Sequence, residues 1–313
     1  MWRPYPGALN VQFTSNFIAR LPRPILDAIV RARRSNAAFR RWSDCLVDRL
    51  RGHDVIMRDG LAKGLFFNSG RSNVAYSFAQ GAVEPDIERA LLTVLKRGMT
   101  FYDVGANFGM LSLIAARLVG PRGRVVSFEP IDANVRIVED NVRINKFENV
   151  TVLPIALGNS DGTARFLQFS EPSWGMLATT GNALEASVGD TIVTVKRLDT
   201  AVREYRLPSP QVIKIDVEGG ELEVLPGAAD TIRTSRPLMF IEVHGTTNAI
   251  IASMLTQYDY DACLPGTWAP VGGASGNVHM LAVPRERADC ADLLGVFRDS
   301  AFPKCARCDE IAK

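Results

Sequence analysis

The sequence lacks both a strong excess of charge and a long apolar run. Its 313 residues contain 36 Lys and Arg against 34 Asp and Glu, a formal net charge of +2. Overall charge therefore gives no reason to expect nucleic acid as a partner. The apolar runs are shorter than the roughly 18–20 residues of a membrane-spanning helix, which predicts no integral membrane segment. The first residues lack the continuous apolar stretch of a secretory signal. These absences together predict a cytoplasmic protein.

Cysteine is also scarce. The five cysteines are Cys45, Cys263, Cys290, Cys305 and Cys308. An odd and scattered set suits a reducing compartment better than a disulfide framework. Cys305 and Cys308 have the spacing of a metal or redox pair, but a structural zinc site normally takes four ligands. An ordinary reduced tail is the preferred interpretation, and the role of the pair stays open.

Charge is unevenly distributed, and this suggests a division of the chain. Residues 1–60 contain eleven Arg and five Asp. Apolar residues between Ile25 and Leu50 recur at helical spacing. One interpretation is that this helix contacts an anionic substrate or a membrane surface. The other, which is preferred, is that the helix packs on the main domain and its charged face is solvated. We predict an N-terminal helical extension or substrate cap at 1–80, a main domain at 81–290 and a C-terminal tail at 291–313.

From residue 99 the sequence alternates between strand-like and helix-like segments. The predicted strands are 100–104, 124–128, 150–155, 212–216, 238–243, 260–264 and 278–283. Strands that alternate with helices predict an α/β fold with a parallel sheet covered by helices on both faces. Two more strand-like segments, 163–169 and 190–197, predict a hairpin-like insertion at about 159–197.

The most informative stretch is residues 101–109. A β-prone apolar segment runs into a turn with Gly105, Asn107 and Gly109, and a helix-like segment follows at once. This arrangement places backbone N–H groups and a helix N-terminus against a ligand. Glycine lets a ligand approach the backbone closely. Asp103 is predicted to point its carboxylate into the same crevice.

Other polar residues also stand where predicted strands end, which is where parallel sheets bind ligands. Glu129 can accept hydrogen bonds from both hydroxyls of a ribose. Asn107 replaces a glycine of the dinucleotide fingerprint. Asp103 repels a pyrophosphate but suits the ammonium and sulfonium of S-adenosylmethionine. The pattern favours that cofactor over NAD(P), and a non-catalytic cofactor-binding protein is a third alternative.

Taken together, these motifs resemble the FkbM-type S-adenosylmethionine-dependent methyltransferases. The resemblance rests on residues 103–109, 128–130, Asn141 with Asn145, 156–158, 214–219 with Glu221, and 241–244. It covers about residues 80–245, and Gly220 stands where the family is expected to have Ala. It implies a Rossmann-like class I methyltransferase fold, with a seven-stranded, mostly parallel sheet whose last strand, 278–283, is antiparallel.

The resemblance also implies which residues bind the cofactor. The predicted set is Asp103, Gly105, Asn107, Phe108, Gly109, Glu129, Pro130, Ala156 and Leu157. Asp103, Gly105 and Asn107 would hold the methionine end. Glu129 would hold the ribose, and the Ala156–Leu157 region would flank the adenine. Family members act largely on hydroxyl groups of sugars, polyketides and other specialised metabolites, so a small hydroxylated acceptor is expected.

The predicted catalytic residues follow the later strands. A hydroxyl nucleophile benefits from a nearby base, and His244, Asp216 and Glu218 are the candidates. A neutral His244 would suit this role near pH 7, and a structural role is the alternative. Lys214 shares a strand face with Asp216, so it either pairs with Asp216 or binds substrate. No metal site is predicted firmly, although Asp216, Glu218 and His244 could together hold a divalent cation.

Overall fold

The computed structural model describes residues 54–57, 60–68, 85–168, 175–177, 189–244, 247–263 and 278–286. The chain divides into two units, Met1–Val83 and Glu84–Lys313. The helix predicted at 25–50, the tail at 291–313 and the Cys305–Cys308 pair lie outside the described residues. The predicted domain organisation therefore stays a prediction.

The described part of the first unit contains a small antiparallel hairpin. Strand β1 (Val55–Ile56) pairs with β2 (Phe66–Phe67). Burial alternates along both strands, with Val55 and Phe67 buried and their neighbours exposed, as the pleat requires.

The second unit is built on a seven-stranded sheet. In spatial order its strands are β12 (Tyr260–Cys263), β13 (Val278–Pro284), β11 (Leu238–Val243), β10 (Val212–Ile215), β3 (Thr100–Val104), β4 (Arg124–Phe128) and β5 (Val150–Leu153). Strands β11, β10, β3, β4 and β5 pair in parallel, and β13 runs antiparallel to both β11 and β12. The predicted Rossmann-like sheet with an antiparallel last strand is confirmed.

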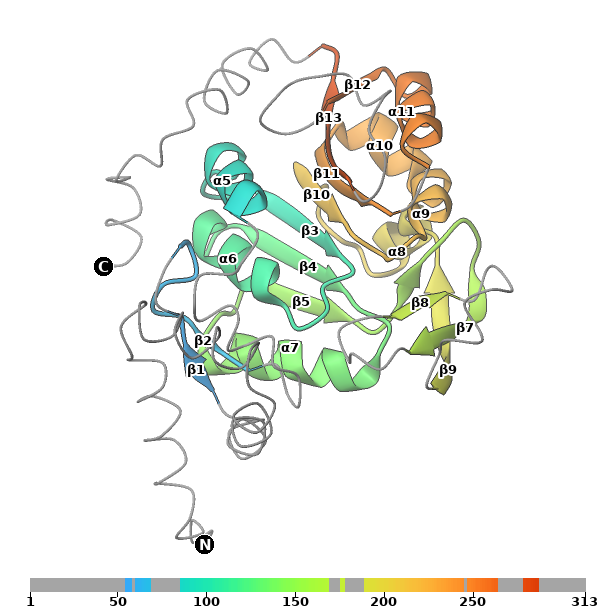
Figure 1. Cartoon of the computed structure of the whole chain (residues 1–313). Coiled ribbons are helices and arrows are strands. Elements are labelled where there is room, and N and C mark those ends of the chain that lie inside the picture. Colours follow the sequence, from blue (N-terminus) through green and yellow to red (C-terminus); the bar gives the residue numbers. More distant parts are fainter. Residues whose placement is uncertain are drawn as a thin grey trace, which may run out of the picture. The chain divides into compact units, whose positions relative to one another are not determined.

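Helices connect these strands on two sides of the sheet. They are α5 (Pro85–Val94), α6 (Met110–Val119), α7 (Asp132–Ile144), α8 (Leu198–Glu204), α9 (Glu221–Gly227), α10 (Ala229–Ser235) and α11 (Asn248–Gln257). Helices α6 and α7 cross over in one direction from β3, whereas α9 and α10 lead from β10 in the other. Because such crossovers are right-handed, the two sets cover opposite faces. Figure 1 shows α5 to α7 grouped apart from α8 to α11.

Burial explains why β3 and α6 lie at the centre of this unit. Every residue of β3 is buried, and nine of the ten residues of α6 are buried. A helix that is apolar almost all round belongs in the interior. The polar end of Tyr102 is satisfied there, because its hydroxyl donates to the carbonyl oxygen of Pro208 at 2.7 Å. The strand that carries the predicted cofactor turn is thus held firmly.

A second, smaller sheet follows β5. Its spatial order is β6 (Ala156–Leu157), β9 (Gly189–Lys196), β7 (Gly162–Gln168) and β8 (Gly175–Leu177). Strands β7 and β9 are antiparallel, which confirms the predicted hairpin-like pairing. The strand predicted at 150–155 is shorter in the structure. β5 ends at Leu153, before a proline that has no N–H for the ladder, and Ala156–Leu157 pairs with β9 instead.

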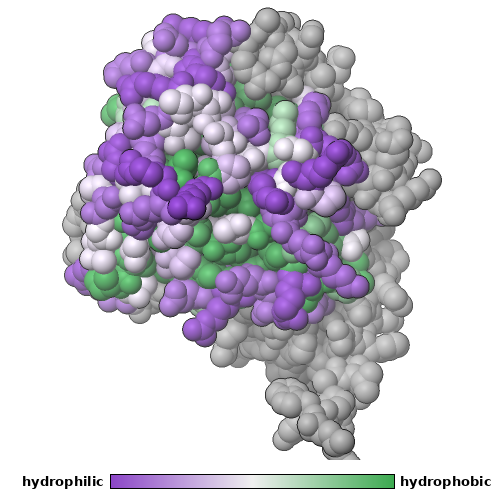
Figure 2. Space-filling view, turned by 180° about the vertical axis from the view of Figure 1, so that it is seen from behind, coloured by the Kyte–Doolittle hydropathy of each residue, from purple (hydrophilic) through white to green (hydrophobic). Residues whose placement is uncertain are grey.

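The face that Figure 2 draws carries both hydrophobic and hydrophilic residues. Figure 2 shows one face on which hydrophobic residues gather towards the middle and hydrophilic residues surround them. In the part of the chain that the structure describes, no helix has both the length and the apolar character needed to cross a membrane.

Candidate active site

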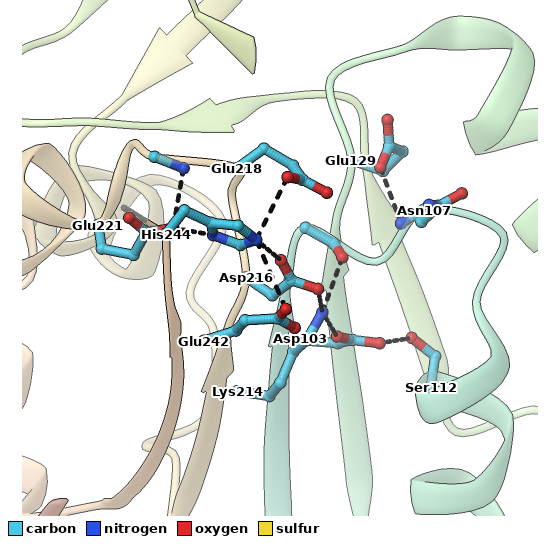
Figure 3. Close-up of polar contacts among 12 residues, drawn as sticks. Asp103, Asn107, Ser112, Glu129, Lys214, Asp216, Glu218, Glu221, Glu242 and His244 are labelled. Carbon is cyan, nitrogen blue, oxygen red and sulfur yellow. Dashed lines mark hydrogen bonds and ion pairs between the residues drawn. The ribbon is translucent and has the colours of Figure 1, made fainter. Parts of the chain in front are cut away.

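The predicted site residues meet where the strand order reverses. Strands β3 and β10 are neighbours, yet the chain passes through β4 and β5 before it returns to β10. Open α/β sheets bind ligands in the crevice at the carboxyl ends of two such strands. Figure 3 shows the residues after β3 beside those after β10, with His244 from the end of β11. The residues predicted from the strand ends are therefore brought together at one edge of the sheet, and their role as a ligand site stays a prediction.

The turn after β3 depends on left-handed backbone. Gly105, Asn107 and Gly109 have φ angles of 79°, 52° and 83°, a region that glycine adopts freely and asparagine tolerates. A Cβ at Gly105 would lie 1.8 Å from the carbonyl oxygen of Asp216. One at Gly109 would lie 2.9 Å from a methyl carbon of Val138. The sequence predicted that these glycines allow a ligand to approach the backbone. The structure shows that other parts of the protein approach both of them closely.

Hydrogen bonds fasten this turn to its neighbours. The backbone N–H groups of Gly105 and Ala106 both donate to the carbonyl oxygen of Phe128 at 3.0 Å. The buried amide of Asn141, from α7, donates to the carbonyl oxygen of Phe108 at 2.9 Å. Phe108 is only 4% exposed, so its ring belongs to the core and its backbone shapes the turn. These contacts fix the shape of the turn.

Glu129 lies beside the turn, at the end of β4, and is 4% exposed. Its Oε2 accepts a hydrogen bond from the backbone N–H of Asn107 at 2.8 Å. Its Oε1 accepts from the N–H of Ile131 at 3.0 Å and from the amide of Asn134 at 3.2 Å. Burial raises the pKa of Glu129 to about 7, although these hydrogen bonds oppose the shift. A carboxylate oxygen can accept more than one hydrogen bond, so ribose hydroxyls fit this group. Pro130, partly buried, follows it.

Asp103 does not point into the crevice as the sequence analysis expected. It is 1% exposed, and its Oδ2 accepts a hydrogen bond from the hydroxyl of Ser112 at 2.5 Å. That hydroxyl also lies 2.7 Å from the hydroxyl of Ser127. The register pairs Asp103 with Ser127 and Lys214 on its two sides, so all three side chains share one face. Burial raises the pKa of Asp103, and the charge of Lys214 opposes the rise. Its carboxylate is therefore held by Ser112 and Lys214 within the protein.

The two residues that were predicted to flank the adenine, Ala156 and Leu157, lie outside the large sheet. Ala156 and Leu157 are 5% and 3% exposed. They form β6 of the smaller sheet rather than the end of β5. Their place beside an adenine stays a prediction.

Lys214 connects the turn with the residues after β10. Its Nζ donates to the carbonyl oxygen of Gly105 at 3.0 Å. The same atom lies 3.2 Å from Asp216 Oδ2 and 3.6 Å from Asp103 Oδ1. The predicted pairing with Asp216 is confirmed. Because Lys214 is only 5% exposed, it holds other site groups in position rather than reaching towards a substrate.

Four carboxylates surround His244: those of Asp216, Glu218, Glu221 and Glu242. We call these four residues and His244 the His244 cluster. The imidazole Nε2 lies 3.2 Å from Glu218 Oε2, 3.5 Å from Glu242 Oε1 and 4.0 Å from Asp216 Oδ1. On the other side of the ring, Nδ1 lies 3.0 Å from Glu221 Oε1. Figure 3 shows the carboxylates converging on the ring from different directions. The three residues predicted to act together here are indeed brought together.

The protonation of this cluster follows from its surplus of negative charge. Burial opposes a charge on His244, but Glu221, Glu242 and Glu218 outweigh it and raise the pKa of the imidazole to about 10. Burial also raises the pKa of Glu218 to about 7, partly offset by the charge of His244. At neutral pH the imidazole therefore carries its second proton and has no lone pair to accept another.

Three residues of this site were not among the predicted site residues: Glu221, Glu242 and Ser112. Glu221 and Glu242 stood inside recognised motifs, and Glu242 precedes His244 by two residues, which places both side chains on one face of a strand. Ser112 interrupts an otherwise apolar stretch of α6. These spacings were visible in the sequence, but the contact between strands that makes them meaningful was not.

The same residues fall within the match to a known protein family. The Methyltransferase FkbM domain matches residues 103–262. The hexuronic acid methyltransferase AglP of Haloferax volcanii is 30% identical over 164 residues, which are 51% of this chain and 62% of that protein. Methyltransferase sdnD of Sordaria araneosa is 28% identical over 152 residues, 40% of this chain and 58% of that protein. The matches thus span less than two thirds of either relative.

A solved structure is similar as well. The crystal structure of Methyltransferase FkbM from Methylobacillus flagellatus KT has 18% sequence identity and a TM-score of 0.41, over 59% of this chain and 43% of that chain. The family match begins at Asp103 and includes the turn, Glu129 and the whole His244 cluster. Because residues 103–262 amount to half of the 313 residues, the chain belongs to the FkbM methyltransferase family.

Proposed function

We propose that this chain is an S-adenosylmethionine-dependent methyltransferase that methylates a hydroxyl group of a small molecule. One observation carries the proposal: a preformed turn with a buried carboxylate lies next to an accessible group of carboxylates at the switch point of one sheet. The first half suits a ribose-bearing cofactor, and the second suits the loss of a proton from an acceptor. Lys214 links the two halves through Gly105 and Asp216.

The residues of the turn fit this cofactor. Glu129 offers a buried carboxylate to the ribose hydroxyls, and the Gly105–Gly109 backbone offers the preformed turn beside it. The carboxylate-rich His244 cluster provides the negative potential that attracts a sulfonium. S-adenosylmethionine, when bound, supplies a methyl group whose transfer to an acceptor hydroxyl releases S-adenosylhomocysteine and one proton.

The chain's own carboxylates would receive that proton. Asp216 and Glu218 have side chains that are 23% and 34% exposed, so an acceptor molecule can reach them. Glu218 adopts a left-handed φ of 52°, which turns its loop towards the imidazole. We assign proton acceptance to these carboxylates, with His244 as the charged group that orients them. A base of this kind contributes about 10²–10⁴-fold to rate, and alignment of the reacting atoms adds more.

The acceptor class is proposed from chemistry and from one relative. AglP is named for its action on a hexuronic acid, a molecule rich in hydroxyl groups. Hydroxyl-bearing sugars and sugar acids are therefore the first acceptors to test here. Nucleic acid is not expected as an acceptor, given the net charge of +2.

Calorimetric titration with S-adenosylhomocysteine tests the cofactor assignment. The wild-type chain should bind one molecule, and Glu129→Ala should weaken binding at least tenfold because the ribose loses its acceptor. Glu139→Ala, which removes an exposed carboxylate from helix α7, the next element after Glu129, should change nothing. Equal binding by both variants would contradict the proposed ribose site.

Two other functions can be separated cheaply. A nicotinamide oxidoreductase should bind NADH in a fluorescence titration, and we expect no such binding. A non-catalytic cofactor-binding protein should bind S-adenosylhomocysteine yet produce none from S-adenosylmethionine. We expect product release with at least one member of a panel of sugars, sugar acids and other hydroxylated metabolites.

A further inference from the structure

We infer that Asp216, Glu218 and His244 form a binding site for a divalent cation of the Mn²⁺ or Mg²⁺ class, and that Glu221 orients the imidazole ligand. The inference deepens the proposed function, because such a cation would bind the acceptor hydroxyl at the same crevice. It rests on the geometry of the His244 cluster and on the burial of Glu221.

The spacing of the donor atoms suits one small ion. Ligand atoms of Asp216, Glu218 and His244 all lie within 4.8 Å of one another. Ligands about 2.1 Å from an octahedral ion stand about 3.0 Å apart when adjacent and about 4.2 Å apart when opposite. The distances from His244 Nε2, 3.2 Å to Glu218 and 4.0 Å to Asp216, fall in this range. Small side-chain movements would complete the coordination, and the Nε2 proton of His244 would leave to solvent as the cation replaces it.

The two carboxylate oxygens of Asp216 face different groups. Oδ2 faces the buried ammonium of Lys214 at 3.2 Å, whereas Oδ1 faces the imidazole Nε2. Glu242 Oε1 lies 3.5 Å from the same nitrogen and could serve as a further ligand or accept a hydrogen bond from bound water. Carboxylate oxygens with one imidazole suit Mn²⁺ and related ions, whereas thiolates, which soft ions prefer, are not among these groups.

Glu221 supplies an observation that is independent of the exposed carboxylates. It is 1% exposed, and its Oε1 lies 3.0 Å from His244 Nδ1 and accepts a hydrogen bond from the N–H of Gly219. Its Oε2 has no hydrogen-bond partner in the described structure. A buried carboxylate directed at the far nitrogen of an imidazole is the usual support of a metal-binding histidine, since it fixes the ring so that Nε2 faces the ion.

The cation would change how the acceptor loses its proton. A hydroxyl oxygen bound to a divalent cation becomes more acidic, so its O–H proton can leave to water. The oxygen then forms a bond to the transferred methyl carbon as the carbon–sulfur bond of the cofactor breaks. In this state Glu218 acts as a ligand rather than as the proton acceptor. The ligand side chains are 15–34% exposed, which leaves an entry path for both ion and acceptor.

Titration of the chelator-treated full chain with Mn²⁺, followed by calorimetry and electron paramagnetic resonance, tests the site. We expect one bound Mn²⁺ per chain, with the spectrum of a protein-bound ion. Glu218→Gln and His244→Asn should each weaken binding more than tenfold. Glu223→Gln, the same change of a carboxylate on α9 outside the cluster, should bind as the wild type does. Glu221→Gln should weaken binding about 10–100-fold, as loss of a supporting carboxylate does.

Failure of this inference can be told apart from failure of the proposed function. If neither Mn²⁺ nor Mg²⁺ binds at 1 mM-scale concentrations, or if Glu218→Gln and Glu223→Gln bind equally while circular dichroism shows both folded, the cation site is wrong. Full methyl transfer in excess chelator would also overturn it and leave the methyltransferase proposal standing. Mn²⁺ binding without any binding of S-adenosylhomocysteine would support the site and contradict the proposed function.

Discussion

The cofactor turn and the His244 cluster lie at the same edge of one sheet, yet they differ in how fully the protein compensates the negative charge of their carboxylates. At the turn, Glu129 is buried and receives three hydrogen bonds from the protein. In the cluster, four carboxylates surround one imidazole, and several of these side chains remain partly exposed. Hydrogen bonds from the protein therefore compensate Glu129, whereas the His244 cluster keeps a surplus of negative charge.

Under the proposed function, this difference predicts two stages of recognition. A preformed turn binds a ligand without first having to reorganise, which is how fixed dipoles and backbone groups act most effectively. A surplus of carboxylates is costly to keep together, because like charges repel. Such a group becomes more stable when it gains a proton or a cation. Lys214 lies between the two regions and is the buried cation that both of them contact.

Gly105→Ala should have the largest effect, because it breaks the contact between the turn and the end of β10. The new Cβ would meet the carbonyl oxygen of Asp216 at 1.8 Å, and the residue has a φ of 79°. Backbone strain of about 1–3 kcal/mol and overpacking of about 1–3 kcal/mol or more should combine. We expect urea denaturation to show a loss of about 4 kcal/mol in unfolding free energy, together with loss of S-adenosylhomocysteine binding.

Gly98→Ala separates the two causes. Gly98 has a φ of 88°, but a Cβ there would meet nothing within 4 Å. Only the backbone strain applies, so we expect a loss of about 1–2 kcal/mol and unchanged cofactor affinity. Equal losses in Gly98→Ala and Gly105→Ala would mean that the close approach of the turn to β10 does not contribute.

Lys214→Met should uncouple the turn from the cluster. It leaves the carboxylate of Asp103, which is 1% exposed, without its nearest cation. Removal of one partner from a buried ion pair costs about 3–5 kcal/mol. We expect chemical denaturation to show a loss of about this size, and Asp103→Asn in the same chain to recover part of it by removing the unpaired charge.

No recovery in the Lys214→Met/Asp103→Asn double variant would mean that Lys214 acts mainly through Gly105 or Asp216. A comparison within the chain is available in Lys196, whose ion pair with Glu204 is partly exposed. Exposed pairs contribute little to stability. Lys196→Met should therefore cost far less than Lys214→Met.

The sequence predicted much of this fold because its strands and helices have clear periodicity and glycine boundaries. Strands 100–104, 124–128 and 238–243 were predicted with the bounds that the structure shows. The short helices α8 and α10 were missed, since seven residues span only about two turns and carry little periodic signal. The bend after Leu153 was missed too, because the pairing of β6 with β9 depends on residues about 40 positions away.

The convergence of the candidate site residues was predicted from the sequence, but the contacts among them were not. Strand ends identified Glu129, Asp216 and His244, because the carboxyl ends of parallel strands meet. The inward burial of Asp103 was not foreseen, since its partners Ser112, Ser127 and Lys214 come from three separate elements. The charge state of His244 likewise depends on carboxylates that no single stretch of sequence brings together.

The smallest expected effect concerns pH and the buried carboxylate of the turn. Burial raises the pKa of Glu129 to about 7, so most of this group is protonated at pH 6 and ionised at pH 8. Ribose hydroxyls donate hydrogen bonds, and the ionised carboxylate accepts them better. Apparent affinity scales with the competent fraction, so S-adenosylhomocysteine should bind up to about tenfold more tightly at pH 8 than at pH 6. Calorimetry at both pH values measures this, and Glu129→Gln should remove most of the difference while the pH dependence of the ligand itself remains. A wild-type affinity with the same pH dependence as Glu129→Gln would place the ribose elsewhere and leave Glu129 as a structural link between the turn and β4.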